Sequence, residues 1–159
     1  MYEFDYKVPS PRQPIKEIQE NRKVVNIYEA RDINFTGVNN NREKVDFSKL
    51  NIHDFFNESH PHLKLEHNET VGTIRRMEFQ PVEKDGGIFN FEFSFTDKEQ
   101  ERRWVNNEID GFSFGVAFKR PPQRTNNGRY FSGESLLKEI TLTERPAYGN
   151  KSRVKKDRD

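Results

Sequence analysis

Three separate segments of the chain carry a histidine, a serine and a carboxylate that could form one nucleophilic centre. His67 follows the alternating segment LKLE, Ser113 lies within Gly-Phe-Ser-Phe-Gly, and Glu139 lies within LLKEITLT. A serine hydroxyl can attack a carbonyl carbon, a histidine can accept its proton, and a carboxylate can orient the histidine. Because such groups are assembled in space, their separation along the chain does not argue against this arrangement.

The segment around Ser113 has one bulky face and one bare face. In residues 111–118 the small residues alternate with large apolar ones, so Ser113, Gly115 and Ala117 share a face opposite Phe112, Phe114, Val116 and Phe118. Such a strand either packs closely against another backbone, with a hydrogen-bonded hydroxyl, or forms the floor of a cleft. The pattern alone leaves both interpretations open.

His67 and Glu139 also have structural interpretations. Strict alternation in residues 63–67 places His67 on the same face as Leu63 and Leu65, where a lone histidine is ordinarily a hydrogen-bonded core residue. In residues 136–143, Glu139, Thr141 and Thr143 share one face, and Leu136, Ile140 and Leu142 share the other. A mid-strand glutamate is unusual, so Glu139 is either a solvated residue of an edge strand or a side chain that orients another.

Hydrophobic periodicity predicts the elements that must position these residues. Strands are expected at 23–28, 63–67, 73–79, 88–95, 111–118 and 136–143, and the period-2 phenylalanines of 88–95 should be core. A short helix or irregular turn is expected within 47–56 and a loop at 119–133. Thr96 to Glu99 reads as a capping box that starts a helix ending near Ile109. The fold class is therefore a β-rich α+β domain.

Composition limits the domain count and the partners. A chain of 159 residues with 14 Phe can build one core. Its net charge of +1 gives no field that would draw it to nucleic acid or to an anionic membrane. The absence of cysteine excludes disulfides and a thiolate nucleophile. Residues 1–21 are expected to be a flexible polar arm, 22–150 the folded domain and 151–159 a basic tail.

The blocks LKLEHNETVGTI, DGFSFGVAF and LLKEITLTERPAYGNKSRV resemble, in this order, the signatures of the prohead proteases, the capsid-maturation serine proteases of tailed phages. Their order and spacing make the resemblance specific where one block would be weak. Gly-Phe-Ser-Phe-Gly alone could indicate an α/β-hydrolase elbow, but that motif needs a strand–turn–helix context. The family is similar in fold to the herpesvirus assembly proteases, which implies a compact, mostly antiparallel β-barrel with a few flanking helices.

The resemblance implies a serine endopeptidase with His67 as base, Ser113 as nucleophile and Glu139 as the third member, with Glu144 as the other candidate for that position. Its implied partners are the major capsid protein and the scaffold protein or domain, and self-association is an open option. It would cleave these proteins and itself inside the procapsid, in the host cytoplasm. No cofactor, nucleic acid or membrane is implied. Backbone amides, assisted by Arg120 or Arg145, would stabilise the oxyanion.

Three other interpretations remain open. Asn68, where many relatives have Asp, and the short tail would fit a catalytically inactive protease fold that serves as a structural or assembly component of the particle. An unrelated β-rich binding module would leave Ser113 far from His67. Four residues, His53, Asp54, His60 and His62, could be imagined as a metal site, but Pro61 between the last two favours loop histidines.

Overall fold

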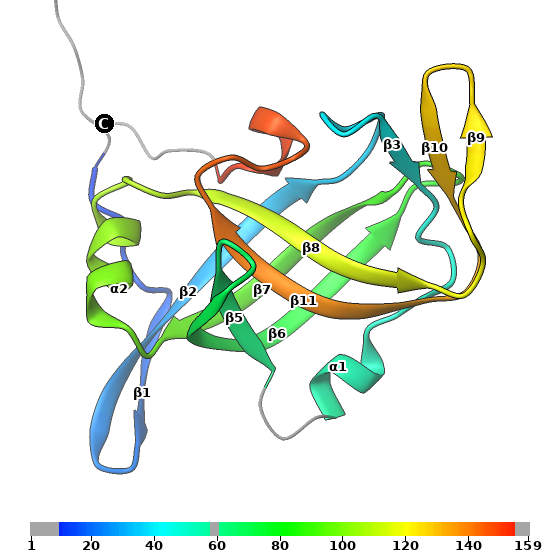
Figure 1. The fold of residues 1–159 in the computed structure, drawn as a ribbon. Helices are drawn as coiled ribbons and strands as arrows, with labels where there is room; N and C mark the ends of the chain where they lie inside the picture. Colours follow the sequence, from blue (N-terminus) through cyan, green and yellow to red (C-terminus); the bar gives the residue numbers. More distant parts are fainter. Residues whose placement is uncertain (1–9, 58–60, 155–159) are drawn as a thin grey trace, which may run out of the picture.

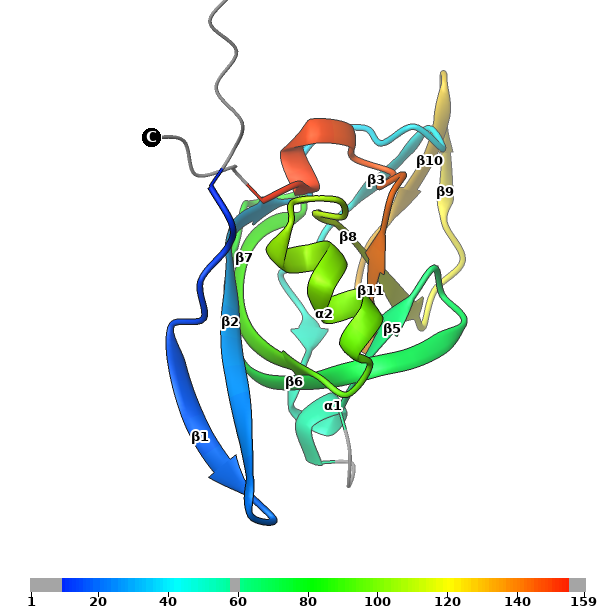
Figure 2. The ribbon, with the colours of Figure 1, turned by 90° about the vertical axis from the view of Figure 1, so that its left-hand side faces the viewer.

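The computed structural model describes residues 10–57 and 61–154, which form a curved β-sheet with small flanking elements (Figure 1). Helix α2 covers one open end of the curved sheet (Figure 2). The elements, in chain order, are β1 (Lys16–Glu20), β2 (Lys23–Asn34), β3 (Glu43–Val45), β4 (Leu50–Asn51), α1 (His53–Asn57), β5 (His62–Leu65), β6 (Glu69–Pro81), β7 (Gly87–Phe95), α2 (Lys98–Val105), β8 (Gly111–Phe118), β9 (Gln123–Thr125), β10 (Gly128–Phe131), β11 (Ser135–Thr143) and the short 3-10 helix η1 (Gly149–Ser152).

The main sheet has eight strands in the order β1-β2-β7-β6-β5-β11-β4, and β8 pairs with the other edge of β11. A second sheet has the order β3-β10-β9. The β-rich α+β class is therefore confirmed. The predicted barrel is not closed by hydrogen bonds in the described part of the chain, because the path does not return to its first strand. Instead η1 contacts both β2 and β8 and fills part of the seam between them.

Alternating phenylalanines build the core, as their period predicts. Phe89, Phe91 and Phe93 of β7 are buried, and Phe95 is half-buried at the strand end. Their rings meet the bulky face of β8, with Phe91 4.7 Å from Phe112 and Phe89 4.8 Å from Phe114 between ring centroids. This edge-to-face packing fixes the position of β8 and hence of the serine that it carries.

Helix α2 begins and ends at different residues from those predicted. Its N-cap is Asp97, whose carboxylate accepts a hydrogen bond from the Gln100 amide at 3.1 Å, so the expected capping box at Thr96 is wrong. Aspartate caps as well as threonine, and here the chain turns one residue later. The helix ends at Val105 rather than near Ile109, because Asn107 adopts a left-handed φ of 61°.

The N-terminal arm is more ordered than its composition predicts. Residues 16–20 form β1 and pair antiparallel with β2, although their polar, charged composition had suggested a flexible arm to residue 21. Arg12 is buried beside α2, where its guanidinium lies 4.1 Å from the Trp104 ring centroid and donates to the Ile109 carbonyl at 3.0 Å. Backbone pairing and this stacking, neither of which depends on hydrophobicity, offset the cost of ordering. Residues 1–9 lie outside the described part.

The start of the basic tail also packs on the domain. Ser152 is fully buried, Arg153 forms an isolated β-bridge with Gly111, and the Val154 amide donates to the Asp110 carbonyl at 3.0 Å. The carboxylate of Asp110 lies 2.6 Å from Arg153 Nη1 and 3.8 Å from Arg12 Nη2. The folded body therefore extends beyond the predicted limits of 22–150 at both ends. Residues 155–159 lie outside the described part.

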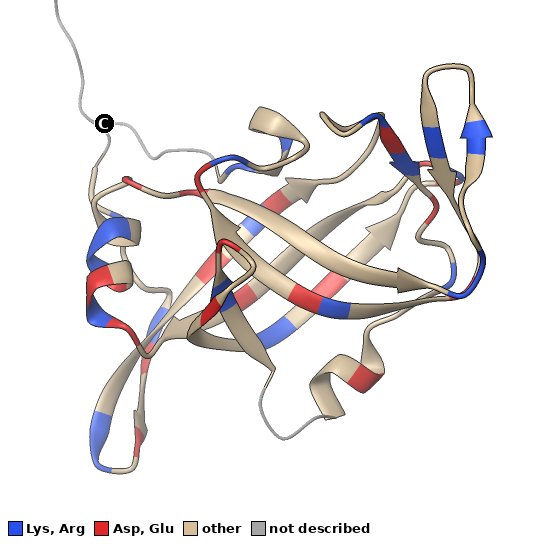
Figure 3. Ribbon diagram, viewed as in Figure 1, with Lys and Arg blue, Asp and Glu red and all other residues tan. Residues whose placement is uncertain are grey.

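Charged residues of both signs are interspersed along the ribbon in the view of Figure 3. The predicted loop at 119–133 contains the β9–β10 hairpin, whose strand β10 also pairs parallel with β3. Among the described residues, no helix is long and apolar enough to cross a membrane.

Candidate active site

The antiparallel pair of β8 and β11 carries two of the candidate residues. Ser113 lies opposite Thr141, and Gly115 lies opposite Glu139. Since directly opposed residues share one face of a sheet, the hydroxyl of Ser113 and the carboxylate of Glu139 start on the same side. β8 runs without a break from Gly111 to Phe118, which agrees with the strand predicted for these residues and leaves no strand–turn–helix elbow.

A β-bulge at Lys138 sets the orientation of Glu139. The register between β8 and β11 shifts between Leu137 and Glu139, so Lys138 is the extra residue and is exposed. Before the bulge Leu137 is buried, and after it Ile140 and Leu142 are buried. The prediction that Leu136 shares a face with Ile140 and Leu142 was therefore wrong, because one inserted residue reverses the alternation. β11 lies between β8 and β5, so Glu139 is not a residue of an edge strand.

His67 reaches this face from a tight turn and not from a strand. β5 ends at Leu65, and both Glu66 and His67 have left-handed φ values, 50° and 59°. The Asn68 amide donates to the Leu65 carbonyl at 3.0 Å, which closes the turn. Two left-handed central residues define a type I′ hairpin turn. The predicted strand to His67, with its side chain beside Leu63 and Leu65, was therefore wrong.

Contacts with β11 hold this strained turn. The Glu66 amide donates to the Leu142 carbonyl at 3.0 Å, and the His67 amide donates to Thr141 Oγ1 at 2.9 Å. The carboxylate of Glu66 accepts from the Thr143 hydroxyl at 3.0 Å and from the Glu144 amide at 2.7 Å. A left-handed residue costs about 1–2 kcal/mol, and these four hydrogen bonds are of the size needed to offset that cost.

The carboxylate of Glu139 meets the imidazole of His67. Glu139 Oε1 is hydrogen-bonded to His67 Nδ1, and Glu139 Oε2 lies 3.6 Å from Lys64 Nζ on β5. Glu144, the other candidate for this role, is instead paired with Arg103 of α2 at 2.5 Å. Of the two acidic residues considered from the sequence, the structure therefore brings Glu139 to His67.

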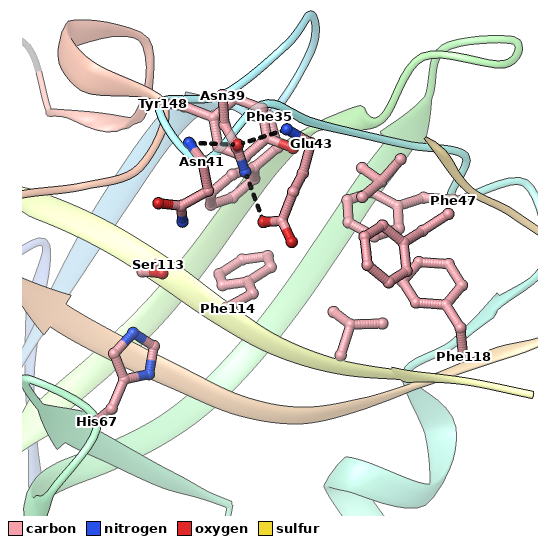
Figure 4. A pocket seen from close by; sticks show the side chains of 13 residues that line it. Phe35, Asn39, Asn41, Glu43, Phe47, His67, Ser113, Phe114, Phe118 and Tyr148 are labelled. Carbon is pink, nitrogen blue, oxygen red and sulfur yellow. Dashed lines mark hydrogen bonds between the residues drawn. The ribbon is translucent and has the colours of Figure 1, made fainter. Parts of the chain in front are cut away.

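Ser113 and His67 line the same pocket (Figure 4). It has a volume of about 270 Å³ and lies between β8 and the segment from Phe35 to Phe47. The His67 side chain is 50% exposed, so it is accessible from solvent. In the described part of the chain no hydrogen bond joins the Ser113 hydroxyl to the imidazole, as is common for catalytic groups before substrate binds. Arg120 and Arg145 do not line the pocket.

No family model, curated protein or solved structure matches this chain.

Of the three residues predicted from the sequence, His67 and Glu139 are joined by a hydrogen bond, and Ser113 lines the same pocket as His67. The structure adds Thr141, Glu66 and Lys64 as partners that sequence reasoning missed. Thr141 could have been found, because it lies two residues after Glu139 on the same predicted face. The role of Glu66 could not, since Glu-His lacks the glycine or asparagine that signals a type I′ turn.

The metal interpretation of the histidine-rich loop has no donor set in the described part of the chain. His53 begins α1 and His62 begins β5, and His60 lies outside the described residues. Across residues 10–57 and 61–154, no three or more histidine, aspartate or glutamate side chains are grouped so that they could hold a metal ion.

Proposed function

We propose that this protein is a serine endopeptidase in which Ser113 is the nucleophile, His67 the general base and Glu139 the residue that orients the base. The observation that carries the proposal is the contact of Glu139 with Nδ1 of a histidine whose ring faces the same pocket as Ser113. An ionised carboxylate can only accept hydrogen bonds, so Nδ1 carries the proton and Nε2 is left as the basic nitrogen.

The reaction follows from these positions. Ser113 Oγ attacks the peptide carbonyl carbon while His67 Nε2 takes the hydroxyl proton, and Glu139 stabilises the imidazolium. The C–N bond then breaks, the imidazolium protonates the departing amine, and an acyl-enzyme remains. Water, deprotonated by the same histidine, releases the acid and restores Ser113. Backbone amides would have to supply the oxyanion donors, each worth about 3 kcal/mol.

The three sequence blocks support a more specific proposal, that the protein is a prohead protease and acts in phage capsid maturation. Its fold would then be similar to that of the herpesvirus assembly proteases, which is called assemblin-like. Its substrates would be segments of the scaffold and major capsid proteins, and the protease itself, within the procapsid. Confinement raises the effective concentration of substrate, so weak intrinsic affinity would be sufficient. The exposed His67 fits a substrate that is itself a folded chain or an extended segment of one.

A serine-reactive fluorophosphonate tests the proposal directly. We expect the wild-type protein to be labelled at Ser113 and the variant Ser113→Ala to be unlabelled. The matched control is Ser48→Ala, which removes an exposed serine outside the pocket and should keep full labelling. A folded wild-type protein that is never labelled would favour the alternative, a catalytically inactive structural component of the particle.

Co-expression with a capsid protein tests the biological role. If the proposal is right, the wild-type protease shortens the major capsid protein and Ser113→Ala does not. Shortening by the Ser113→Ala protein would contradict the assignment of the nucleophile. Labelling of Ser113 without processing of any capsid or scaffold protein would keep the chemistry and reject the substrate class.

A further inference from the structure

Besides Ser113 and His67, the polar residues Asn39, Asn41 and Glu43 line the pocket, and its apolar lining runs along β8. Phe114, Val116 and Phe118 line it from the bulky face of β8 and Ser113 from the opposite face, and Phe47 and Phe131 also belong to the lining. The volume of about 270 Å³ lies just below the roughly 300 Å³ at which small-molecule pockets begin. The whole pocket thus has room for about one large side chain.

The apolar walls are held by their neighbours. Phe114 lies 4.4 Å from Phe35 and 4.8 Å from Phe89, measured between ring centroids. Phe118 lies 5.3 Å from Phe131 and is stacked at 6.4 Å on Phe47. Rings packed on two sides do not move aside freely, so the pocket is shaped before a substrate arrives.

The acidic residue on the rim does not favour a basic side chain. Glu43 lines the pocket, but its carboxylate is bound by Arg129 Nη2 at 2.7 Å and by Asn39 Nδ2 at 3.3 Å. Its charge is therefore already paired. A charged substrate side chain would lose water without gaining a new partner, whereas an apolar one gains from leaving water.

From this lining we propose that the pocket binds a bulky apolar side chain of the substrate next to the scissile bond. The inference rests on the proposed function and names the class of sequence that the enzyme cleaves. Leucine, methionine and phenylalanine are preferred at this position, and lysine, glutamate and alanine are poor. Each missing methylene in such a pocket costs about 10- to 200-fold in rate, so the phenylalanine-to-alanine ratio should exceed about 10-fold.

Peptidyl phosphonate probes that differ only in the side chain at the reactive centre test this preference. Labelling of Ser113 is followed by intact mass, and the second-order rate is compared among Phe, Leu, Ala, Lys and Glu probes. Faster labelling by the Phe and Leu probes, by about 10-fold or more, supports the inference. Equal or faster labelling by the Ala, Lys or Glu probe overturns it and leaves the nucleophile in place. A small fluorophosphonate without a side chain reports the proposed function separately, and failure of every reagent rejects both.

Two neighbouring variants locate the preference in the pocket. Val116→Phe narrows it, so the ratio of Phe-probe to Ala-probe rates should fall about 10-fold or more. Ala117→Phe adds the same ring at the adjacent, exposed position outside the pocket and should keep the wild-type ratio. An unchanged ratio in a folded Val116→Phe protein contradicts the assignment. Should that variant not fold, the probe series on the wild-type protein still decides the question.

Discussion

Glu139 of β11 lies directly opposite Gly115 of β8, and a Cβ added to Gly115 would approach the Cβ of Glu139 to 3.0 Å. The bare face of β8 is therefore occupied by a side chain from the neighbouring strand. Both interpretations of this face, close packing and the floor of a cleft, therefore apply to different residues. Close packing at Gly115 lets the Glu139 side chain reach His67, while Ser113 lines the pocket.

Replacement of Gly115 by alanine should disturb the site more than the fold. The added methyl group must push the Glu139 side chain back by a few tenths of an ångström, because 3.0 Å is shorter than an ordinary carbon–carbon contact. We expect the rate of fluorophosphonate labelling to fall about 10-fold or more, while overpacking lowers the free energy of unfolding by about 1–3 kcal/mol. Ala117→Ser, on the same strand but exposed, is the control and should change neither quantity. Wild-type labelling by Gly115→Ala would show that the position of Glu139 does not matter.

Glu139→Gln should remove most of the activity with little loss of folded protein. An amide keeps the shape but cannot stabilise the imidazolium, and the comparable change in a serine-protease triad lowers kcat by about 10⁴. The measurement is kcat/KM on a cleaved peptide, with circular dichroism to verify folding. The matched variant Glu144→Gln loses only the surface pair with Arg103 and should retain near wild-type kcat/KM. Equal losses in both variants would argue that neither carboxylate orients His67.

Thr141→Val tests whether β11 holds the His67 turn. Valine fills the same fully buried volume but cannot accept the hydrogen bond from the His67 amide. We expect a loss of about 1 kcal/mol in the free energy of unfolding by urea, and a lower kcat, because the imidazole is less well positioned. Thr70→Val, exposed on β6, should leave kcat unchanged. An unaffected kcat in Thr141→Val would mean that the turn keeps its shape without this contact.

Glu66→Gly separates backbone strain from side-chain anchoring. Glycine adopts a left-handed φ at no steric cost, so strain alone would predict a more stable protein. Loss of the carboxylate contacts with Thr143 and Glu144 should outweigh this gain and lower both the melting temperature and kcat. In Lys84→Gly, at a left-handed φ of 59° in another turn, the same change should leave the melting temperature equal or higher. A more stable and fully active Glu66→Gly protein would contradict the anchoring role.

The strands that carry the site could be predicted from the sequence better than the turn and the bulge that orient His67 and Glu139. The period-2 pattern of 111–118 places Ser113 correctly, because the pattern is uninterrupted and β8 is regular. Residues 63–67 alternate just as strictly, yet the strand stops at Leu65, since the hydrogen bonds of Glu66 and His67 to β11 stabilise a turn. Such contacts join residues more than 70 positions apart and leave no local signal. The bulge at Lys138 also has no local sequence signal, because no glycine marks it.

The carboxylate of Asp110 joins two arginines just before the start of β8, the strand that carries Ser113. One oxygen faces Arg12 and the other faces Arg153, so two segments from opposite ends of the chain are fastened to the residue directly before β8. Removal of either arginine would leave a nearly buried carboxylate with only one of these two cationic partners. Loss of the contact at either arginine would therefore act directly on the start of β8, the strand that carries Ser113.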